Sequence, residues 1–180
     1  MTVEPLPIAG ALLVTPSVYT DARGSFAEIF SRARYAEAGI ADEFVQDNLS
    51  ISRRGVLRGL HGDARMSKLV QVLEGEAFDA IADVREGSPT YGRWHATVLR
   101  ASGRRQIYIP KGCLHGFLAL SGHVIFLYKQ SALYDPASEF GVAWNDAELA
   151  IEWPLDGRPP ILSDKDAANP PLADLIAGRA

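Results

Sequence analysis

Short runs of apolar and β-branched residues fill the middle of the chain, and glycine, proline, asparagine, aspartate and serine separate them. Runs of about four to eight such residues are typical of β-strands, whereas a helix repeats its apolar positions every three to four residues. The pattern predicts strands at residues 68–73, 77–84, 95–99, 106–109 and 123–129. Turn residues lie between them in the segments EGEA, REGSPTYG, ASGRR, PKGCLHG and LSGH.

The regular spacing of the predicted strands indicates how they pair. Turn signals about ten residues apart are typical of antiparallel sandwiches and barrels. We therefore expect a mainly β protein built as a small barrel. Helical periodicity is confined to the edges, where residues 30–38 predict a short helix that ends at Gly39. The last dozen residues favour neither helix nor strand.

The length and the distribution of proline indicate the domain organisation. The chain has 180 residues, enough for one domain with a sizeable core, and it shows no internal repeat. We expect residues 1–180 to form a single domain. Proline disfavours the interior of helices and sheets, so we expect residues 154–180 to run as an ordered loop over the barrel, because this tail contains Pro154, Pro159, Pro160, Pro170 and Pro171.

The overall charge and the single cysteine narrow the classes of function. A net charge of −4 and a pI near 5.5 argue against a broad nucleic-acid interface, because such proteins usually carry a basic excess. Cys113 is the only cysteine, which indicates a reducing compartment. No run approaches the roughly 20 apolar residues of a membrane helix, and the N-terminal segment lacks the basic residues of a signal peptide. We expect a cytoplasmic protein that binds neither nucleic acid nor membrane.

Residues 46–75 hold the most informative set of polar side chains. Arg58, His61 and Lys68 follow one another on strand-like sequence with glycines between them, and we expect them to lie within one hairpin. An imidazole that titrates near neutral pH, a lysine and a planar guanidinium suit the transfer of a proton on an anionic substrate. The grouping indicates an enzyme.

Strand alternation gives Lys68 a distinct position. It shares a face with Val70 and Val72, which are expected to point into the core. An inward lysine is suited to stabilise a developing oxyanion. The alternative is an edge lysine that discourages pairing between sheets.

Two segments, LRGLHG and PKGCLHGF, each carry one histidine beside glycines. The spacing of Pro110, Gly112 and His115 resembles the second half-motif of the cupin superfamily, a double-stranded β-helix whose barrel mouth commonly holds a metal. A catalytic metal site typically needs about three protein ligands, and the first segment offers only His61. We therefore favour metal-free chemistry. A metal-dependent cupin enzyme, such as a dioxygenase or phosphosugar isomerase, is the alternative.

Nine motifs in order are similar to those of the dTDP-4-dehydrorhamnose 3,5-epimerase family. They are DARGSFAE from Asp21, QDN from Gln46, GVLRGLH from Gly55, KLV from Lys68, SPTYGRW from Ser88, IPKGCLHGF from Ile109, YK at Tyr128, WND from Trp144 and LSDKD from Leu162. The resemblance implies a jelly-roll (cupin-like) barrel, a double-stranded β-helix with short peripheral helices. It also implies a homodimeric isomerase without a cofactor that acts on a nucleotide-linked 4-keto-6-deoxy sugar.

The same resemblance assigns four catalytic roles. His61 is the base that removes a proton beside the ketone, and Asp166 orients it. Lys68 faces the oxygen at carbon 4, and Tyr128 returns a proton from the opposite face. Tyr128 also shares a strand face with Val124 and Phe126, so packing in the core is the alternative for it.

Further residues are assigned to substrate binding by the resemblance. Arg58 suits the diphosphate because its planar group donates two hydrogen bonds at once. His115 and Asp83 resemble a second dyad near the barrel mouth. The alternatives are a turn made by Asp83 with Arg85 and a buried, hydrogen-bonded His115. The full set is Arg23, Glu28, Gln46, Asn48, Arg58, Asp83, His115, Tyr134, Glu139 and Lys165.

The chain departs from the usual family pattern directly after His61. Relatives have an aromatic residue, a glutamine and a longer loop there, whereas this chain has Gly62, Asp63 and a short loop. The nucleotide (dTDP, GDP, CDP or UDP) and the inverted carbon therefore stay open, as does the pathway served. Inversion of one carbon on another nucleotide 4-keto sugar, such as a heptose, is one alternative. A non-catalytic sugar-binding barrel is another.

Overall fold

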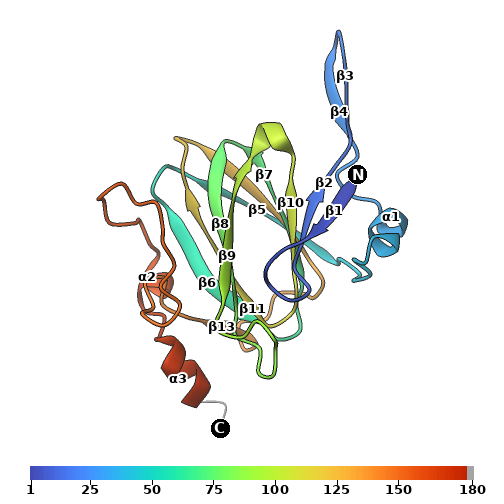
Figure 1. Ribbon diagram of the computed structural model, residues 1–180. Coiled ribbons are helices and arrows are strands. Elements are labelled where there is room, and N and C mark those ends of the chain that lie inside the picture. Colours follow the sequence, from blue (N-terminus) through green and yellow to red (C-terminus); the bar gives the residue numbers. More distant parts are fainter. Residues whose placement is uncertain (178–180) are drawn as a thin grey trace.

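Two antiparallel sheets that face each other make up the body of the molecule in the computed structural model, which describes residues 1–177 (Figure 1). One sheet has the order β1 (Thr2–Pro5), β2 (Leu12–Thr15), β10 (Gln106–Ile109), β7 (Lys68–Glu74), β12 (Val124–Gln130) and β5 (Gln46–Ser52). The other has the order β13 (Glu139–Gly141), β6 (Leu57–Asp63), β11 (Cys113–Ala119), β8 (Glu76–Asp83) and β9 (Trp94–Arg100). The mainly β, jelly-roll architecture expected from the sequence is confirmed.

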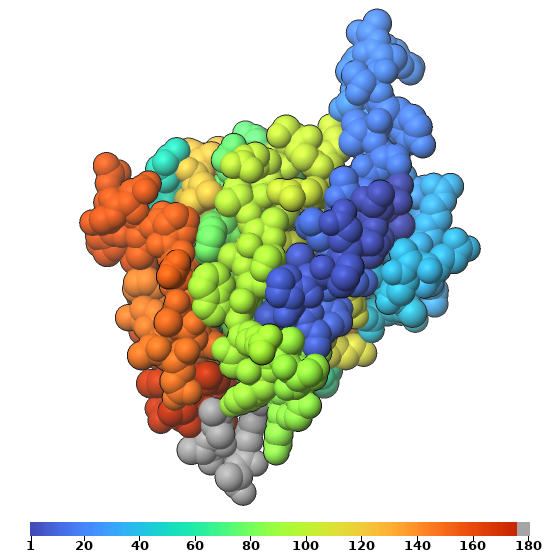
Figure 2. Space-filling view, in the orientation of Figure 1, coloured from blue at the N-terminus to red at the C-terminus, as the bar shows by residue number. Residues whose placement is uncertain are grey.

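The remaining elements lie at the edges of this sandwich. A hairpin of β3 (Val18–Asp21) and β4 (Gly24–Ala27) projects from the body, as Figures 1 and 2 show. The helices are short: α1 (Arg32–Glu37), the 3-10 helix η1 (Ala101–Gly103), α2 (Asp164–Ala167) and α3 (Leu172–Ala177). Among the described residues, no helix has the length and apolar character to cross a membrane.

Apolar side chains fill the space between the sheets and cover both outer faces. The inner core contains Val70 and Val72 of β7, and the rings of Phe117 and Phe126 stack there with centroids 4.3 Å apart. The C-terminal segments cover the outer face of the five-stranded sheet, and residues around Tyr35 of α1 cover that of the six-stranded sheet. Each large apolar side chain removed from water contributes about 1.5–3 kcal/mol, so burial holds the peripheral segments against the sheets.

All five strands predicted from the sequence are confirmed, with ends that differ by at most one residue. The predicted helix at residues 30–38 is also present, but it begins at Arg32, because Ser31 has extended backbone and forms the N-cap. Gly39 follows its end with φ +94°, a left-handed conformation that glycine adopts without steric cost.

The segment PKGCLHG was expected to be a turn, and that interpretation is wrong beyond Gly112. The turn comprises Lys111 and Gly112, and β11 begins at Cys113. Every residue of β11 is buried, because the strand lies between β6 and β8 in the centre of its sheet. A strand buried on both faces shows no alternation of apolar and polar residues, so its sequence carried no strand signal.

The tail was expected to contain neither helix nor strand, and this is wrong for α2 and α3. Ser163 is the N-cap of α2, where its hydroxyl accepts a hydrogen bond from the Asp166 amide. Pro170 and Pro171 lie directly before α3, where proline is tolerated because the first turn has no partner for its amide. Residues 178–180 of the predicted tail lie outside the described residues.

Candidate active site

A cavity of about 550 Å³ opens between the two sheets and gathers most of the residues predicted to carry function. It is lined by the predicted residues Asn48, Arg58, His61, Lys68, His115, Tyr128, Tyr134, Glu139, Lys165 and Asp166. Asp47, Leu49, Ser50, Phe117, Gln130 and Ser163 complete the lining. The predicted site is therefore a physical pocket inside the barrel.

The expected hairpin of Arg58, His61 and Lys68 does not form. Strand β6, which carries Arg58 and His61, lies in the five-stranded sheet, and β7, which carries Lys68, lies in the six-stranded sheet. The short loop between them crosses from one sheet to the other. The imidazole and the ammonium group consequently line the cavity from opposite walls.

An irregularity in β6 lets both Arg58 and His61 face the cavity. Residues three apart on a regular strand point to opposite faces, but the pairing with β11 shifts register between His61 and Arg58. Gly59 lies within the shift with φ +132°, and a Cβ atom there would lie 2.6 Å from the Cα atom of Gly116. Only glycine fits this position, which explains the RGLHG spacing.

His61 and Asp166 form a hydrogen-bonded pair at the cavity wall. The distance from His61 Nε2 to Asp166 Oδ1 is 2.6 Å, and the Gly59 amide donates to Asp166 Oδ2 at 3.4 Å. Burial opposes ionisation of the Asp166 carboxyl, but the hydrogen bond and charge of His61 outweigh burial and lower its pKa. An ionised carboxylate accepts the proton on Nε2, which leaves Nδ1 of His61 as a base.

Lys68 presents an unpaired ammonium group to the cavity. Among the described residues, no hydrogen bond or ion pair involves its Nζ atom. Burial lowers the pKa of Lys68, and the charges of Glu139, Asp63 and Asp79 oppose this lowering. Because β7 lies between β10 and β12 in its sheet, the alternative of an edge lysine is wrong.

Tyr128 lies on β12, in the same sheet as Lys68. Its ring packs against the inner core, and its hydroxyl lies 3.3 Å from Ser50 Oγ. Burial raises the pKa of Tyr128 well above its ordinary value, while the hydrogen bond to Ser50 and the charge of Arg58 act in the opposite direction. The phenol therefore holds its proton at neutral pH, as a proton donor requires.

The second dyad has a different carboxylate from the one expected. His115 Nε2 lies 2.7 Å from Asp79 Oδ2, so the predicted pairing of His115 with Asp83 is wrong. Both carboxylates lie on the inner face of β8, one on each side of Ile81, which is opposite His115 in the ladder. Asp83 instead accepts hydrogen bonds from Arg85, Ser88 and Thr90, which close the turn after β8.

The rim of the cavity is held by its own polar contacts. Glu139 Oε2 accepts hydrogen bonds from Tyr134, at 3.2 Å, and from Lys165. Gln46 lies next to the lining, where its Oε1 accepts the Tyr134 amide at 3.0 Å. Arg58 donates to Ser52 Oγ at 3.1 Å, which fixes its guanidinium beside β5.

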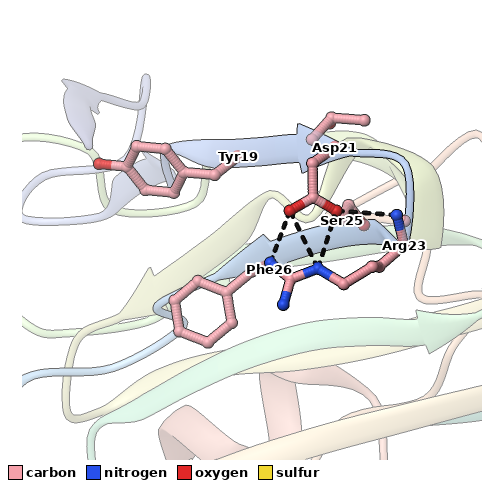
Figure 3. A pocket seen from close by; sticks show the side chains of 7 residues that line it. Tyr19, Asp21, Arg23, Ser25 and Phe26 are labelled. Carbon is pink, nitrogen blue, oxygen red and sulfur yellow. Dashed lines mark hydrogen bonds and ion pairs between the residues drawn. The ribbon is translucent and has the colours of Figure 1, made fainter.

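Arg23 and Glu28 lie outside the cavity of their own chain. Arg23 sits at the turn of the projecting hairpin, where its Nη2 atom lies 2.6 Å from Asp21 Oδ2 (Figure 3). Tyr19 and Phe26 line the same shallow surface hollow. Glu28 pairs with Arg34 at 2.8 Å. The hairpin carries Arg23 away from the body, and Glu28 is held beside α1, so neither residue joins His61 here.

The departure after His61 leaves the cavity lining largely untouched. A Cβ atom at Gly62 would lie 2.4 Å from the ring of Phe140, which belongs to the outer apolar cluster. Asp63 is buried and accepts from Ser138 at 2.8 Å. Neither residue lines the cavity.

Within the described residues, no group of three His, Cys, Asp or Glu side chains comes together as a metal site would need.

Sequence reasoning missed Ser50, Gln130 and Asp79. Alternation along β5 could have found Ser50, because Asn48, Ser50 and Ser52 occupy alternate positions of that strand and each contacts a cavity residue. Asp79 could have been found by the same rule on β8. Gln130 follows the predicted strand end and had no signal.

Comparison with known proteins adds an independent finding. Residues 5–174 match the family model described as dTDP-4-dehydrorhamnose 3,5-epimerase. The chain is 46% identical over 168 residues to the dTDP-4-dehydrorhamnose 3,5-epimerase of Methanothermobacter thermautotrophicus, which covers 92% of this chain and 91% of the relative.

Solved structures are similar over nearly the whole chain. One is dTDP-6-deoxy-D-glucose-3,5-epimerase from Legionella pneumophila in complex with dTDP-4-keto-L-rhamnose, with a TM-score of 0.93, 46% identity and coverage of 98% of this chain and 95% of that one. Another is a 3'-monoepimerase from Streptomyces bikiniensis in complex with dTDP-quinovose, with a TM-score of 0.91, 34% identity and coverage of 97% and 90%.

Proposed function

Because this chain belongs to the dTDP-4-dehydrorhamnose 3,5-epimerase family, we propose that it is a cofactor-independent epimerase of a nucleotide-linked 4-keto-6-deoxy sugar. One observation carries the proposal. A base paired with a carboxylate, His61, and a protonated phenol, Tyr128, line one cavity from opposite sheets. Inversion at carbon requires removal of a proton from one face and delivery to the other, and this cavity offers a group on each side.

Proton abstraction is assigned to His61. The ketone at carbon 4 acidifies the hydrogens on both neighbouring carbons, so a well-placed side-chain base can remove one. His61 Nδ1 accepts that proton while Nε2 stays bonded to Asp166. The ionised Asp166 then stabilises the imidazolium that forms.

Stabilisation of the enolate is assigned to Lys68. When the proton leaves, negative charge develops on the oxygen at carbon 4. The ammonium group of Lys68 has no partner among the described residues, so it does not have to break an ion pair to meet that charge. A fixed cation aimed at a developing oxyanion is worth about 10²–10³ in rate in comparable sites.

Delivery of the new proton is assigned to Tyr128. Its hydroxyl is protonated at neutral pH because burial disfavours the phenolate. Protonation of the enolate from the wall opposite His61 gives the inverted carbon. The buried pair of His115 and Asp79 belongs to the same sheet as His61, and His115 lines the cavity beside it.

Substrate binding is assigned to the mouth and rim of the cavity. Arg58, positioned by Ser52, suits the diphosphate. Asn48, Tyr134, Glu139 and Lys165 line the same opening and suit the sugar and the nucleotide. Gln46 supports this rim through the backbone of Tyr134.

A homodimer is the proposed working form. Strand β5 is an edge strand of the six-stranded sheet, and its Leu49 and Ile51 are each 63% exposed. On the hairpin, Tyr19 and Phe26 are 67% and 71% exposed. Exposed apolar groups on an edge strand and on a projecting hairpin favour contact with another chain. We propose that a second copy covers them and that each hairpin brings Arg23 and Glu28 to the partner's cavity.

Mixing two inactive variants tests this arrangement. If Arg23 serves the partner's cavity, combining Arg23→Ala with His61→Ala subunits rebuilds one complete cavity per mixed dimer, and activity returns. Light scattering on the separate proteins measures whether each is dimeric. A monomer, or no recovery of activity in mixed dimers, rejects the proposal.

One catalytic domain spanning residues 1–180 is proposed, because apolar contacts of the C-terminal segments with the five-stranded sheet join the tail to the barrel. Limited proteolysis tests this. If the tail can be cleaved off and the remaining barrel keeps full activity, a single domain is contradicted.

Cytoplasmic location is proposed on the one free cysteine, Cys113, which is buried.

Solvent exchange tests the function itself. The protein is incubated in heavy water with dTDP-4-keto-6-deoxyglucose, and deuterium at carbons 3 and 5 is measured by NMR. We expect label at both carbons with inversion. Label at one carbon supports the single-carbon alternative, the reaction of the 3'-monoepimerase to which this chain is also similar. Absence of label with dTDP, GDP, CDP and UDP forms of the sugar rejects the epimerase.

Chelation tests the metal-dependent alternative. We expect activity to be undiminished after exhaustive chelation. Activity that is lost on chelation and restored by adding one metal supports the metal-dependent alternative.

A further inference from the structure

Each turnover of the proposed epimerisation leaves a proton on His61 and takes one from Tyr128. The two groups lie on opposite walls, so the proton does not return directly. The next turnover requires a protonated Tyr128. Tyr128 is half-buried and lines the cavity that the sugar would fill, so a hydrogen-bonding side chain beside its hydroxyl would connect it with water while the sugar is bound; this inference rests on the proposed function.

Ser50 is the one polar group that meets this need. Its Oγ atom lies 3.3 Å from the Tyr128 hydroxyl, and it is the only hydrogen-bond partner of that hydroxyl in the part of the chain that the structure describes. Ser50 is half-buried and lines the cavity. In the ladder of β5 with β12, Ser50 is opposite Phe126 and Asn48 is opposite Tyr128, so the two hydroxyls meet diagonally.

The other neighbours of Tyr128 do not exchange its proton. The ring of Phe126 lies 4.9 Å from the ring of Tyr128, centroid to centroid, and the ring of His115 lies 6.2 Å away. His115 is already paired with Asp79. Burial raises the pKa of Tyr128, and the charges of Asp79 and Asp166 add to this, whereas the hydrogen bond with Ser50 and the charge of Arg58 lower it.

We propose that Ser50 is a positioning residue that fixes the phenol of Tyr128 toward the sugar and returns its proton after each turnover. When Tyr128 gives its proton to carbon, the O–H bond of Ser50 donates to the phenolate. The Ser50 proton then moves to the phenolate oxygen, and a water molecule at the cavity mouth gives a proton to the serine oxygen. The proton shed by His61 neutralises the hydroxide left in the water. One proton per turnover thus passes from His61 to Tyr128.

Ser52 provides a matched comparison on the same strand. It lies two residues along β5 and donates no bond to Tyr128; its Oγ accepts from Arg58 Nε at 3.1 Å. Ser52→Ala therefore loosens the residue assigned to the diphosphate. We expect it to raise KM with little change in kcat, whereas Ser50→Ala lowers kcat with little change in KM.

The first experiment compares two rates in heavy water with dTDP-4-keto-6-deoxyglucose. Deuterium entry without inversion measures proton abstraction by His61, and inverted product measures proton delivery by Tyr128. For Ser50→Ala we expect inverted product to fall roughly ten- to a hundred-fold, the worth of a hydrogen bond to a charged group, while deuterium entry survives. Ser50→Thr keeps the hydroxyl and is expected to recover most of the lost rate.

The second experiment is a double-mutant cycle with Tyr128→Phe. If Ser50 acts through the Tyr128 hydroxyl, adding Ser50→Ala to Tyr128→Phe changes nothing further. If Ser50 merely supports the cavity wall, Ser50→Ala lowers deuterium entry and inversion together. Adding Ser50→Ala to Tyr128→Phe then lowers the remaining activity further. That result, or a Ser50→Ala variant equal to the wild type, overturns the role of Ser50.

These outcomes separate the inference from the proposed function. If the unaltered protein neither exchanges nor inverts any nucleotide sugar of the panel, the epimerase proposal has failed and the role of Ser50 falls with it. If the unaltered protein inverts the sugar and Ser50→Ala does so equally well, only the role of Ser50 is rejected.

Discussion

Two histidine–carboxylate pairs lie next to each other in this barrel, and they differ in how far water reaches them. His61 and His115 are opposite residues of the β6–β11 ladder. The side chains of His61 and Asp166 are 24% and 5% exposed, whereas those of His115 and Asp79 are 4% and 0% exposed. The same chemical pair thus has an accessible imidazole in one case and a sealed one in the other.

The carboxylates of the two pairs also come from different parts of the chain. Asp166 reaches β6 from helix α2 of the tail, and its position depends on the Ser163 N-cap. Asp79 comes from β8, the strand next to β11, and its Oδ1 atom has no hydrogen-bond partner among the described residues. The comparison teaches that exposure separates the two roles: we assign proton transfer to the accessible pair and support of the cavity floor to the sealed pair.

The largest expected effect is on activity at the accessible pair. His61→Ala is expected to lower deuterium entry by about 10²–10⁴, the usual contribution of a general base. Its free energy of unfolding should change little, because the side chain reaches solvent and does not pack the core. Enzyme assay and urea denaturation measure the two quantities. His123→Ala, at an exposed histidine outside the cavity, is the control and should change neither; retained exchange in His61→Ala would break the comparison.

Lys68 faces both pairs from the other wall, and its removal should move activity and stability in opposite directions. Lys68→Met is expected to lower kcat by about 10²–10³, because the enolate loses its cation. The free energy of unfolding should stay equal or rise, since an unpaired ammonium group no longer has to be buried. Parallel kinetics and denaturation test this. Loss of stability together with full activity would mean that Lys68 is structural.

Removing one carboxylate from each pair tests the division of roles. Asp79→Ala leaves the buried donor of His115 without a partner and should cost about 1–3 kcal/mol of unfolding free energy. Asp166→Ala should cost less stability, because His61 finds water, but should lower deuterium entry strongly. Denaturation and exchange rates on both variants decide. Equal losses of stability in the two variants would show that exposure does not separate the pairs.

The smallest expected effect is the acid dependence of stability from Asp83, a carboxylate with no histidine partner. Burial opposes its ionisation, but hydrogen bonds from Arg85, Ser88 and Thr90 hold the pKa of Asp83 well below its ordinary value. A lowered pKa in the folded state stabilises the protein above the unfolded pKa of about 3.9 and loses this contribution as pH falls below it.

The difference between the unfolding free energies of the unaltered protein and Asp83→Asn measures this contribution. It should be largest and constant above about pH 5 and shrink toward pH 2. A difference that grows on acidification would contradict the lowered pKa.

The pattern of apolar runs and turns predicted the barrel because strands follow local rules, whereas most of its lining was assigned by the resemblance to the family. The five predicted strands are short apolar runs bounded by turn residues, and the LRGLHG segment carries the glycines that its irregular backbone needs. The residues of the tail were misjudged because prolines were treated as excluding helix, although Pro171 lies where a helix tolerates it.

Other features depended on contacts that no local pattern contains. By strand alternation, Asp79 and Asp83 lie on the same face of β8, so either could pair with His115. Asp83 does not, because it accepts hydrogen bonds from Arg85, Ser88 and Thr90 in the following turn. The placement of Arg58 and Lys68 on opposite walls depends on which sheet each strand joins. Arg23 lies at the turn of the projecting hairpin, outside the cavity of its own chain.

The central claim is that a base on one wall and an acid on the other act on the same carbon. Tyr128→Phe tests it most directly, with deuterium entry and inverted product measured in the same heavy-water incubation. The account predicts that label still enters through His61 while the inverted product falls sharply. Equal loss of both signals, or inversion at the unaltered rate, would contradict it.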